Sequence, residues 1–405
     1  MTINFKEFRL EECMDAIIDY RGKTPRKTAS GIPLITAKIV KNGRIQEVNE
    51  YIAEEDYDSW MRRGIPEAGD IVLTTEAPLG EVAQLDGRKI ALAQRVITLR
   101  GKKGLLDNDY LKYLLLSNDV QHQLDGRGTG TTVKGIKQSE LRKIILRFPD
   151  FNAQKYIAHV LKKLDDKIEL HRQANQTLEQ MAQVLFKSWF VDFDPVFDNA
   201  LASGMEINDF PEALQKKALA RQQQRQNVQQ SIADGDLEAK PLPEVTRQLF
   251  PSEFEQTDEP SIGINGWVPK GWEVSVIPNC AEFKEGPGIL AKDFHDEGVP
   301  LIRLAGLKNG VSLLDGCNFL SPDKVKDKWN HFKLKKGDIL LSSSASLGRV
   351  AEVDEVASGA IAYTGIIGFR PVEGVTTQRY IKHFLQSSVF QSQVRMMGVG
   401  SVLNH

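Results

Sequence analysis

Apolar side chains recur at steps of three and four positions between residues 151 and 197, the spacing of one stripe along a helix. Neither Gly nor Pro occurs from Phe151 to Asp194, so we expect one helix that ends before Pro195. At about 1.5 Å per residue, about 40 residues make a rod on the order of 60 Å long. The steps are typical of a coiled-coil seam, so we expect a second long helix as partner; the stripe holds Ile157, Leu161, Leu164, Ile168, His171, Asn175, Leu178, Ala182, Leu185 and Trp189.

Outside this helix, short apolar runs alternate with helical patterns. Residues 71–73 and 339–341 follow Gly-Asp turns and predict buried strands, while 109–124 and 378–394 have the periodicity of helices. These segments belong to an internal repeat, since Gly69-Asp70 returns as Gly337-Asp338, 337 − 69 = 268 positions later. Further pairs match in the same order: 31–35 with 298–302, 41–43 with 308–310, 79–83 with 347–351, 110–112 with 380–382, 128–131 with 398–401, and Cys13 with Cys280. The chain therefore holds two copies of one domain.

The predicted fold class is α+β, with two repeated mixed α/β domains separated by the long helix. We expect the first copy at 1–150, the helix and its aromatic exit at 151–197, a polar connector at 198–265 and the second copy at 266–405. In the connector, 214–230 predicts an exposed helix and 231–264 irregular chain, either returning along the rod or acting as a flexible linker. His405 corresponds to Gly135, so we expect the helix that would follow the second copy to be absent from this sequence.

Composition narrows the class of protein. A length of 405 residues suggests two or three domains, and no stretch approaches the roughly 18–20 apolar residues of a membrane span. The N-terminus lacks a secretory pattern, and three cysteines (Cys13, Cys280 and Cys317) suit a reducing compartment, so we expect a cytoplasmic protein. The net charge of −2 argues against general polycation binding, although a local basic face is enough for DNA.

The sequence offers no catalytic motif for nucleotide, methyl-donor or metal chemistry. Gly22-Lys23-Thr24 lacks the upstream glycine of a phosphate-binding loop, and 194–196 lacks the second proline of an amino-methylating site. Asp150 followed by Asp165-Asp166-Lys167 imitates the carboxylates and lysine of a metal-dependent nuclease. On a helix, however, Asp165 and Lys167 point about 200° apart, so we interpret them as a solvated helix face.

Candidate DNA contacts are basic or hydroxyl-bearing residues in loops and at strand ends. Arg and Lys neutralise phosphates, Arg also reads guanine, and backbone amides with hydroxyls can grip phosphate. The basic segment 20–28 is matched in the second copy by the much less basic 283–288, as expected of two readers of different sequences or of unconstrained loops. The loop 126–134 could instead be a hinge, and the hydroxyls could be strand-end turns. The candidates are Arg21, Lys23, Thr24, Arg26, Lys27, Thr74, Thr75, Arg127, Thr129, Thr131, Lys134, Lys284, Ser342, Ser343 and Ser344.

The helix exit, Leu185-Phe-Lys-Ser-Trp-Phe-Val-Asp-Phe-Asp-Pro-Val196, resembles the end of the central conserved helix in specificity subunits of type I restriction-modification enzymes. The stretches Leu249-Phe-Pro-Ser-Glu-Phe254 and Gly266-Trp-Val-Pro-Lys-Gly-Trp272 resemble the start of that family's second DNA-reading domain. The alternative interpretation of the aromatic cluster, with no family meaning, is a plain helix-capping core. The resemblance covers almost the whole chain, except for the second conserved helix that it leads one to expect.

The resemblance implies that each copy reads half of a bipartite site in double-stranded DNA while the helix sets their spacing. It also implies methyltransferase subunits that use S-adenosylmethionine and a restriction subunit that uses ATP and Mg, with no cofactor or metal in this chain. The alternative is a stand-alone or truncated DNA-binding protein. The expected subunit interface is Leu161, Leu164, Ile168, His171, Asn175, Leu178, Leu185, Trp189, Phe190 and Phe193.

Overall fold

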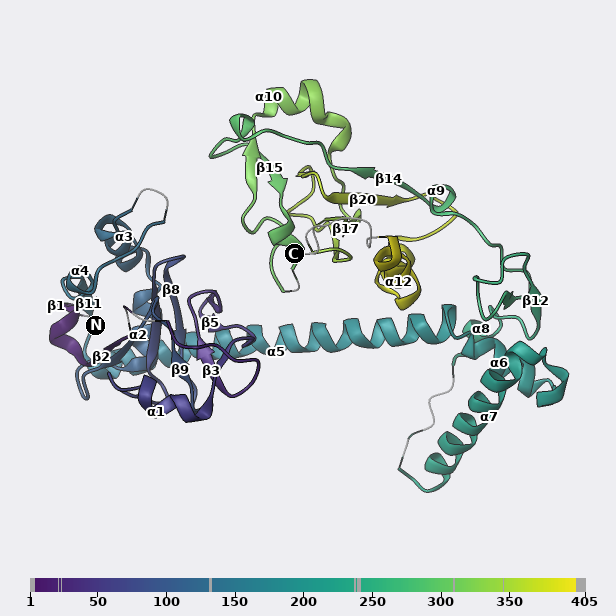
Figure 1. Cartoon of the computed structure of the whole chain (residues 1–405), viewed down its shortest axis with the longest axis horizontal. Helices are drawn as coiled ribbons and strands as arrows, with labels where there is room; N and C mark the ends of the chain where they lie inside the picture. Colours follow the sequence, from purple (N-terminus) through teal and green to yellow (C-terminus); the bar gives the residue numbers. More distant parts are fainter. Residues whose placement is uncertain are drawn as a thin grey trace. The chain divides into compact units, whose positions relative to one another are not determined.

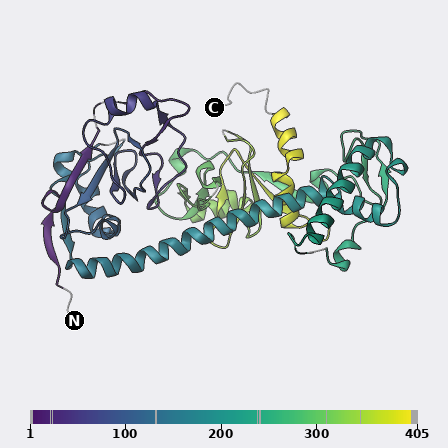
Figure 2. The same ribbon diagram turned by 90° about the horizontal axis from the view of Figure 1, so that it is seen from below.

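The computed structural model describes residues 4–20, 22, 24–130, 133–236, 238, 242–308, 310–344 and 346–397. The chain divides into two compact units, Met1–His171 and Arg172–His405, which we call unit 1 and unit 2. The dividing point lies within the long helix α5 (Phe151–Phe190), which is continuous in both views (Figures 1 and 2). Each unit holds one copy of the repeat.

The first copy is built on a four-stranded antiparallel sheet. Its order is β2 (Met14–Asp19), β10 (Val96–Gly101), β7 (Ile71–Thr75) and β8 (Leu79–Gln84). Successive side chains of a strand point to opposite faces, so Ile71 and Leu73 enter one apolar cluster and Val72 enters another. The first cluster holds helices α2 (Asn108–Leu115) and α3 (Asn118–Arg127); the second holds the small sheet β6-β3-β9 (Tyr51–Ile52, Ile32–Ile35 and Ala91–Leu92). Burial on both faces explains the continuous apolar run at 71–73.

The second copy repeats this arrangement. Its main sheet has the order β14 (Ala281–Glu285), β20 (Ile366–Pro371), β17 (Ile339–Ser342) and β18 (Val350–Glu352). Its small sheet is β16-β15-β19 (Asn318–Leu320, Val299–Ile302 and Ile361–Ala362), and β15 pairs in parallel with β19 as β3 does with β9. Helices α11 (Gln378–Gln386) and α12 (Ser388–Met397) follow the sheet (Figure 1). The predicted sequence repeat is therefore a repeat of one fold, and the predicted α+β class is confirmed.

Shorter elements complete the two copies. The first has β1 (Lys6–Arg9), β4 (Val40–Lys41), β5 (Arg44–Ile45), α1 (Tyr57–Trp60), α4 (Gln138–Leu141) and β11 (Ile145–Phe148). The second has α9 (Ile277–Cys280) and α10 (Pro322–Lys324). Cys13 is fully buried, and burial raises the pKa of its thiol to about 12, as expected of a small core residue rather than a reactive thiol.

The segments 109–124 and 378–394 each form two helices, whereas their periodicity predicted one. The break falls at Ser117 in the first copy and at Ser387 in the second, both with extended backbone. Each serine hydroxyl accepts a hydrogen bond from a backbone N–H three residues later, Val120 at 3.4 Å and Phe390 at 3.3 Å. Serine competes for backbone bonds in this way and starts a new helix instead of continuing the old one.

An ion pair inside each main sheet occupies the same place in both copies. Arg100 donates from Nε and Nη2 to the two carboxylate oxygens of Asp70, both at 2.8 Å. Arg370 donates in the same way to Asp338, at 2.8 and 2.6 Å. Both carboxylates are buried, and bonding to them raises the pKa of each arginine. A buried carboxylate needs a paired charge, so the repeated Gly-Asp motif marks a structural pair.

A glutamine fastens α3 and α12 to their sheets in a second shared contact. Gln121 donates from Nε2 to the carbonyls of Gly80 at 2.9 Å and Leu115 at 2.7 Å. Gln391 donates in the same way to Gly348 and Leu385, at 3.0 and 2.6 Å. Gly80 has a φ of +89°, and a Cβ atom there would lie 2.5 Å from the Gln121 oxygen. This close approach explains why a glycine recurs at this place.

The helix α5 ends through its own backbone and not through proline. The N–H groups of Val191 and Asp192 both bond to the Lys187 carbonyl, and Phe193 then takes a left-handed conformation with a φ of +55°. Pro195 lies in the first turn of the next helix, α6 (Asp194–Ala202), where proline fits well. Pro195, which we expected to end the long helix, therefore lies at the start of a second helix.

The connector folds against the exit of α5. Helix α7 (Glu212–Ala233) was predicted as exposed, yet Leu214 and Ala218 are buried, and Arg221 bonds to Asp198 of α6 at 2.9 and 2.7 Å. The stretch 231–264, predicted as irregular, contains α8 (Glu244–Arg247) and β12 (Phe254–Gln256), and β12 pairs with β13 (Trp267–Pro269) just beyond it. Aromatic rings join these parts into one cluster: Trp189, Phe193, Phe197, Phe210, Phe250, Phe254, Trp267 and Trp272.

The sheet ion pair gives a stability prediction. Asp70→Ala leaves Arg100 without its buried partner, so we expect the free energy of opening of β7 and β10 to fall by about 2–4 kcal/mol. The matched control is Asp86→Ala, which removes the exposed pair of Asp86 and Arg88 and should cost less than about 1 kcal/mol. Native-state hydrogen exchange of the two strands measures both. Equal losses in the two variants would contradict the structural role of the buried pair.

Candidate nucleic-acid interface

Three predicted segments of the first copy meet at one edge of its sheet, where β7 ends and β10 begins. A hollow of about 350 Å³ lies there, and its lining includes Gly22, Thr75, Gln94, Arg95, Thr129 and Lys137. Gly22 belongs to the basic segment 20–28, Thr75 is the end of β7, and Thr129 lies in the loop 126–134. Residues Arg21, Lys23 and Thr131 lie outside the described residues.

The loop 126–134 is held at this edge by backbone bonds. Thr129 and Gly135 exchange N–H···O bonds of 2.8 and 3.0 Å, and the Ile136 N–H donates to the Thr75 carbonyl at 2.9 Å. Gly130 has a φ of +115°, and a Cβ atom there would lie 2.2 Å from the Val133 carbonyl. The described part of the loop is therefore a tight turn fixed to the strand end.

The strand-end hydroxyls point into the protein. Thr74 and Thr75 are buried, and the Thr74 hydroxyl accepts a bond from the Glu81 N–H at 2.9 Å. Ser342 repeats this contact, since its hydroxyl accepts from the Arg349 N–H at 2.8 Å. These bonds fix the turn after the strand, so the structure gives no support to DNA contacts by the hydroxyls of Thr74 and Ser342. Ser343 is partly exposed and Ser344 is exposed.

Three of the five predicted cations that the structure describes have acidic neighbours. Lys27 lies 2.8 Å from Glu50, Arg127 lies 3.4 Å from Glu140, and Lys134 pairs with Asp125. Such exposed pairs are weak and can open for phosphate. Thr24 and Arg26 are exposed.

Two cations at this edge were missed. Arg95 lies 3.5 Å from Glu76, and exposed Lys137 lines the same hollow. Arg95 comes from a segment with no basic cluster, and Lys137 lies three residues after Lys134, just outside the predicted loop 126–134. The fold brings both to the edge.

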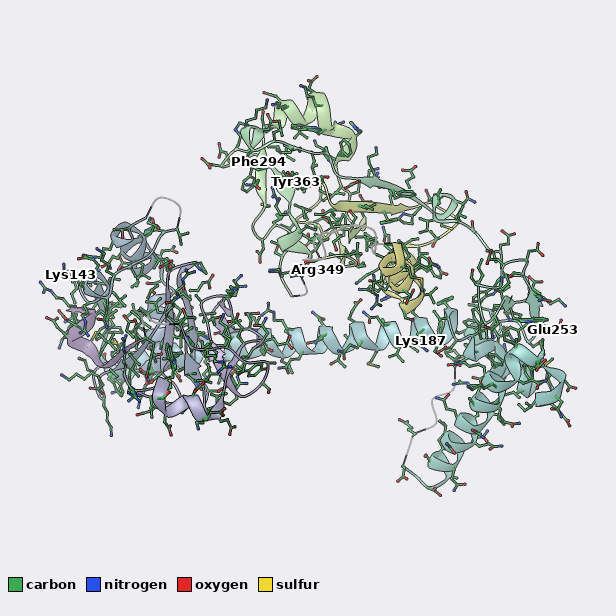
Figure 3. The ribbon with its side chains drawn as sticks, in the orientation of Figure 1. Lys143, Lys187, Glu253, Phe294, Arg349 and Tyr363 are labelled. Atoms are coloured by element: carbon green, nitrogen blue, oxygen red, sulfur yellow. The ribbon has the colours of Figure 1, made fainter. Side chains whose placement is uncertain are left out.

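The second copy carries a stacked arginine beside its small sheet, where β15 and β19 end. The Arg303 guanidinium lies over the Tyr363 ring, 4.1 Å from its centroid, and 5.6 Å from the centroid of the Phe294 ring. The rings of Phe294 and Tyr363 are neighbours (Figure 3). Arg303 also donates to Asn318 at 3.1 Å. The predicted Lys284 lies 3.3 Å from the His331 carbonyl and 5.4 Å from the centre of the Phe332 ring. A stacked arginine and aromatic rings here contrast with the glycine, hydroxyls and ion pairs of the first copy.

The predicted subunit interface is largely exposed along α5. Leu164, Ile168, Leu178 and Leu185 are 56, 52, 61 and 50% exposed, whereas Leu161 is half-buried. His171 and Asn175 are also exposed. The described chain thus leaves this stripe open to solvent.

The aromatic end of the predicted interface is already covered within unit 2. Trp189 lies 5.5 Å from Phe250, and Phe190 lies 5.3 Å from Tyr380, between ring centroids. Phe193 is only 4% exposed. The structure therefore does not support a partner contact by Phe193, because the connector packs against it.

The nuclease-like residues have structural contacts. Asp165 accepts hydrogen bonds from Lys112 Nζ at 2.6 Å and from the Tyr113 hydroxyl at 3.0 Å, and Asp150 caps α5 by accepting from Asn152 and Ala153. Burial raises the pKa of Asp165, but these bonds and nearby charges lower it below its usual value overall. In the described ranges, no three His, Cys, Asp or Glu side chains are placed to share a metal ion. The same part of the chain has no helix long and apolar enough to cross a membrane.

Comparison with known proteins shows what this chain is similar to. Residues 3–180 match the family described as "Type I restriction modification DNA specificity domain". The type I restriction enzyme HindI specificity subunit of Haemophilus influenzae is 33% identical over 219 residues, 53% of this chain and 47% of that protein. The MjaIX specificity subunit of Methanocaldococcus jannaschii is 26% identical over 321 residues, 78% of this chain and 60% of that protein. The chain thus spans about half to three fifths of these curated relatives.

A solved structure of the type I restriction-modification S subunit from M. genitalium aligns over 99% of this chain and 80% of its own, with 16% identity and a TM-score of 0.42. Residues 3–180 thus match a type I restriction-modification DNA specificity domain, and the chain is similar in sequence to specificity subunits of type I restriction enzymes.

The Asp165 carboxylate allows a pH test. Because the pKa of Asp165 is lowered in the folded chain, its bonds stabilise the fold at pH values above the unfolded pKa of about 4. This stability is lost as the pH falls through the pKa of Asp165 in the folded chain. Asp165→Asn should therefore cost about 1 kcal/mol at pH 7 and progressively less towards about pH 3. Calorimetry across this range measures it, with the exposed neighbour in Asp166→Asn as control. A loss of stability in Asp165→Asn that does not change with pH would count against the bond between Asp165 and Lys112.

Proposed function

We propose that this chain is the sequence-specific DNA-binding specificity subunit of a type I restriction-modification complex, in which each copy of the repeat reads one half of a bipartite site. The observation that most supports this is the specificity domain over residues 3–180 together with a second copy that has the same strand order. Two copies of one DNA-reading domain can each bind one half-site.

The two copies share interior contacts but differ in surface residues, which supports recognition of two different DNA sequences. The pairs Asp70–Arg100 and Asp338–Arg370 are the same contact, so the scaffold is shared. The surface cations differ in place, with Arg95 and Lys137 beside the end of β7 in the first copy and Arg303 stacked on Tyr363 after β15 in the second. Arginine at a groove can contact guanine bidentately and lysine can contact phosphate, so unlike surfaces favour unlike half-sites.

In this proposal α5 spaces the two readers, so that the unread gap in the site follows from the length of the helix. Its exposed stripe, from Leu164 to Leu185, is the surface for a second long helix or for the methyltransferase subunits. A seam of leucines left in water forfeits about 1.5–3 kcal/mol for each side chain that a partner could bury.

Chemistry belongs to the partners in this proposal. Methyltransferase subunits would bind S-adenosylmethionine, and a restriction subunit would use ATP and Mg, in the cytoplasm. The contacts of Asp165 with Lys112 and Tyr113 favour a structural role for the nuclease-like residues. A stand-alone DNA-binding protein is the second candidate; it would bind its site tightly without partners, whereas a specificity subunit should bind well only in the complex.

Exchange of one reader tests the division of labour. Replacing residues 1–150 with the equivalent domain of another specificity subunit should change one half of the methylated motif and leave the other half unchanged. The reciprocal exchange of residues 266–397 is the control and should change the opposite half. Mapping of methylated bases after co-expression with the methyltransferase subunits measures both. A change in both halves from either exchange would rule out one reader per half-site.

Incubation of the pure chain with DNA, Mg and S-adenosylmethionine tests where the chemistry lies. We expect neither cleavage nor methyl transfer, because the carboxylates at 165–166 sit on a helix that packs against α2. Gel analysis and transfer of a labelled methyl group are the measurements. Turnover that disappears in Asp165→Ala would overturn the proposal, since it would make Asp165 catalytic.

A further inference from the structure

The small sheets of the two copies correspond strand by strand at one end. In the first copy, the N–H group of Ala93, just after β9, donates to the last carbonyl of β3 at 2.9 Å. In the second copy, the N–H group of Tyr363, just after β19, donates to the last carbonyl of β15 at 3.0 Å. Ala93 therefore corresponds to Tyr363. By the same register, Thr36 after β3 corresponds to Arg303 after β15.

Backbone bonds relate the neighbouring strand of each small sheet in the same way. Both bonds are 2.9 Å long and run from an N–H group to a carbonyl, from Thr28 to Tyr51 in the first copy and from His295 to Phe319 in the second. The residues that precede these partners therefore also correspond, Lys27 with Phe294 and Glu50 with Asn318. Four places on the two small sheets can thus be compared directly.

In the first copy these four places present an ion pair and two small side chains. Lys27 Nζ lies 2.8 Å from the Glu50 carboxylate. Thr36 and Ala93 are each only 9% exposed. The surface here is therefore a charged pair beside two short, buried side chains.

In the second copy the same four places hold one arginine in a fixed setting. The Arg303 guanidinium lies 4.1 Å from the centre of the Tyr363 ring and 5.6 Å from the centre of the Phe294 ring. The Tyr363 hydroxyl donates to the Ile289 carbonyl at 3.3 Å, which holds the ring in place. Arg303 donates from Nη1 to the Asn318 amide oxygen at 3.1 Å. Every one of the four places has changed its chemistry while the strands beneath them are the same.

The contacts of Arg303 leave two of its donors available. Among the residues that the structure describes, its side chain makes one hydrogen bond, from Nη1, and no ion pair with a carboxylate. Its Nε and Nη2 groups are the same two donors with which Arg100 holds both oxygens of Asp70. Arg303 is partly exposed, so a molecule at the surface can reach these donors. A planar pair of donors held in one orientation matches two neighbouring acceptors.

We propose that Arg303 reads a guanine in the half-site of the second copy, donating from Nε and Nη2 to the O6 and N7 acceptors of that base. Tyr363, Phe294 and Asn318 are positioning residues that hold the guanidinium. This assignment rests on the proposed function, in which the second copy binds double-stranded DNA. A phosphate contact needs only a charge near the backbone, whereas stacking and the amide bond fix a direction, which a base contact requires. The first copy has no arginine at this place and reads its own half-site with other groups.

Mapping of methylated bases tests the assignment in the full chain co-expressed with methyltransferase subunits. The wild-type motif should contain a required G·C pair in the half-site that follows the second copy when residues 266–397 are exchanged. In Arg303→Lys, which keeps the charge but loses the planar donors, modification of sites with another base pair at that position should rise about tenfold or more relative to the original site. Arg303→Ala should relax the same position, and Asn318→Ala should relax it less. Both half-sites should otherwise stay as in the wild type, which also shows that the variants fold and assemble.

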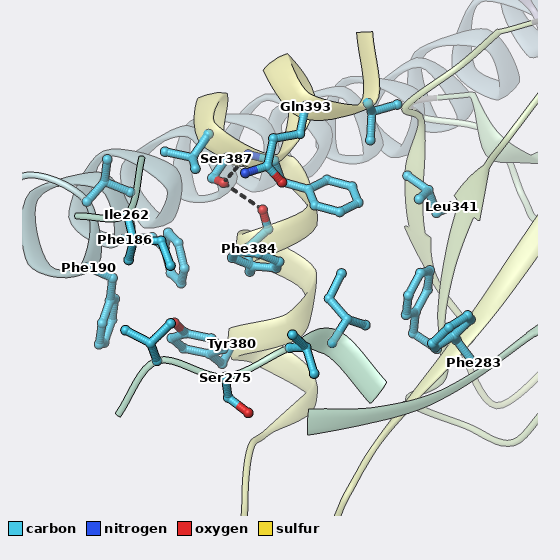
Figure 4. Close-up of a pocket in the computed structure, with 18 of the residues that line it drawn as sticks. Phe186, Phe190, Ile262, Ser275, Phe283, Leu341, Tyr380, Phe384, Ser387 and Gln393 are labelled. Atoms are coloured by element: carbon cyan, nitrogen blue, oxygen red, sulfur yellow. Dashed lines mark hydrogen bonds between the residues drawn. The ribbon is translucent and has the colours of Figure 1, made fainter. Parts of the chain in front are cut away.

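Two control variants change exposed polar residues of the same copy away from this place. Lys336→Ala removes a cation that pairs with Glu355, and Gln393→Ala changes a side chain at a separate apolar hollow (Figure 4). Neither control should alter the motif.

Three outcomes would overturn the assignment while leaving the proposed function intact. The first is an unchanged motif in both Arg303→Lys and Arg303→Ala. The second is weaker modification of all sites in Arg303→Ala that Arg303→Lys restores, which would make Arg303 a phosphate contact. The third is relaxation in the half-site of the first copy. A wild-type chain that directs no two-part motif would instead contradict the proposed function, before any variant is compared.

Discussion

Each copy of the repeat must bury the apolar side of a helix that follows its main sheet, and both use α5 for part of that burial. In unit 1, Lys112 of α2 bonds to Asp165 at 2.6 Å. In unit 2, Lys382 of α11, the residue 270 positions later, lies 3.1 Å from Glu179. One 40-residue helix thus carries an equivalent anchor in each unit. A long helix is stable in water mainly through packing of its apolar face, and each unit adds one polar contact of this kind to α5.

The repeat separates what must be constant from what is free to vary. The buried Asp–Arg pairs, the glutamines on the sheet glycines and the hydroxyls after the central strand recur because each satisfies a buried polar group. Exposed residues at the ends of the strands do not have to satisfy buried polar groups in this way. The first copy places Arg95 and Lys137 beside the end of β7, and the second stacks Arg303 on Tyr363 after β15. A scaffold held by identical interior bonds can therefore carry two unlike surfaces, which is what a reader of two different half-sites requires.

The sequence predicted the long helix, the buried strands and the repeat, because periodicity and self-similarity can be read along the chain. It did not reveal the pairing of Asp70 with Arg100, since the partners are 30 positions apart and meet only when the sheet forms. A hydroxyl after a buried strand looks the same in sequence whether it faces solvent or, like Thr74, accepts a backbone N–H. Arg95 stands in no basic cluster and Lys137 lies just outside the predicted loop 126–134, so only the fold gathers them. The domain boundaries and the individual DNA contacts stay predictions.

The central claim is that two copies of one domain read two half-sites at a distance set by α5. Mapping of methylated bases in a host genome that carries this chain with its methyltransferase partners, compared with a host lacking the chain, tests it most directly. The account predicts a modified motif that depends on the chain and consists of two short specific runs separated by an unread gap of fixed length. A continuous motif, or modification that persists without the chain, would contradict it.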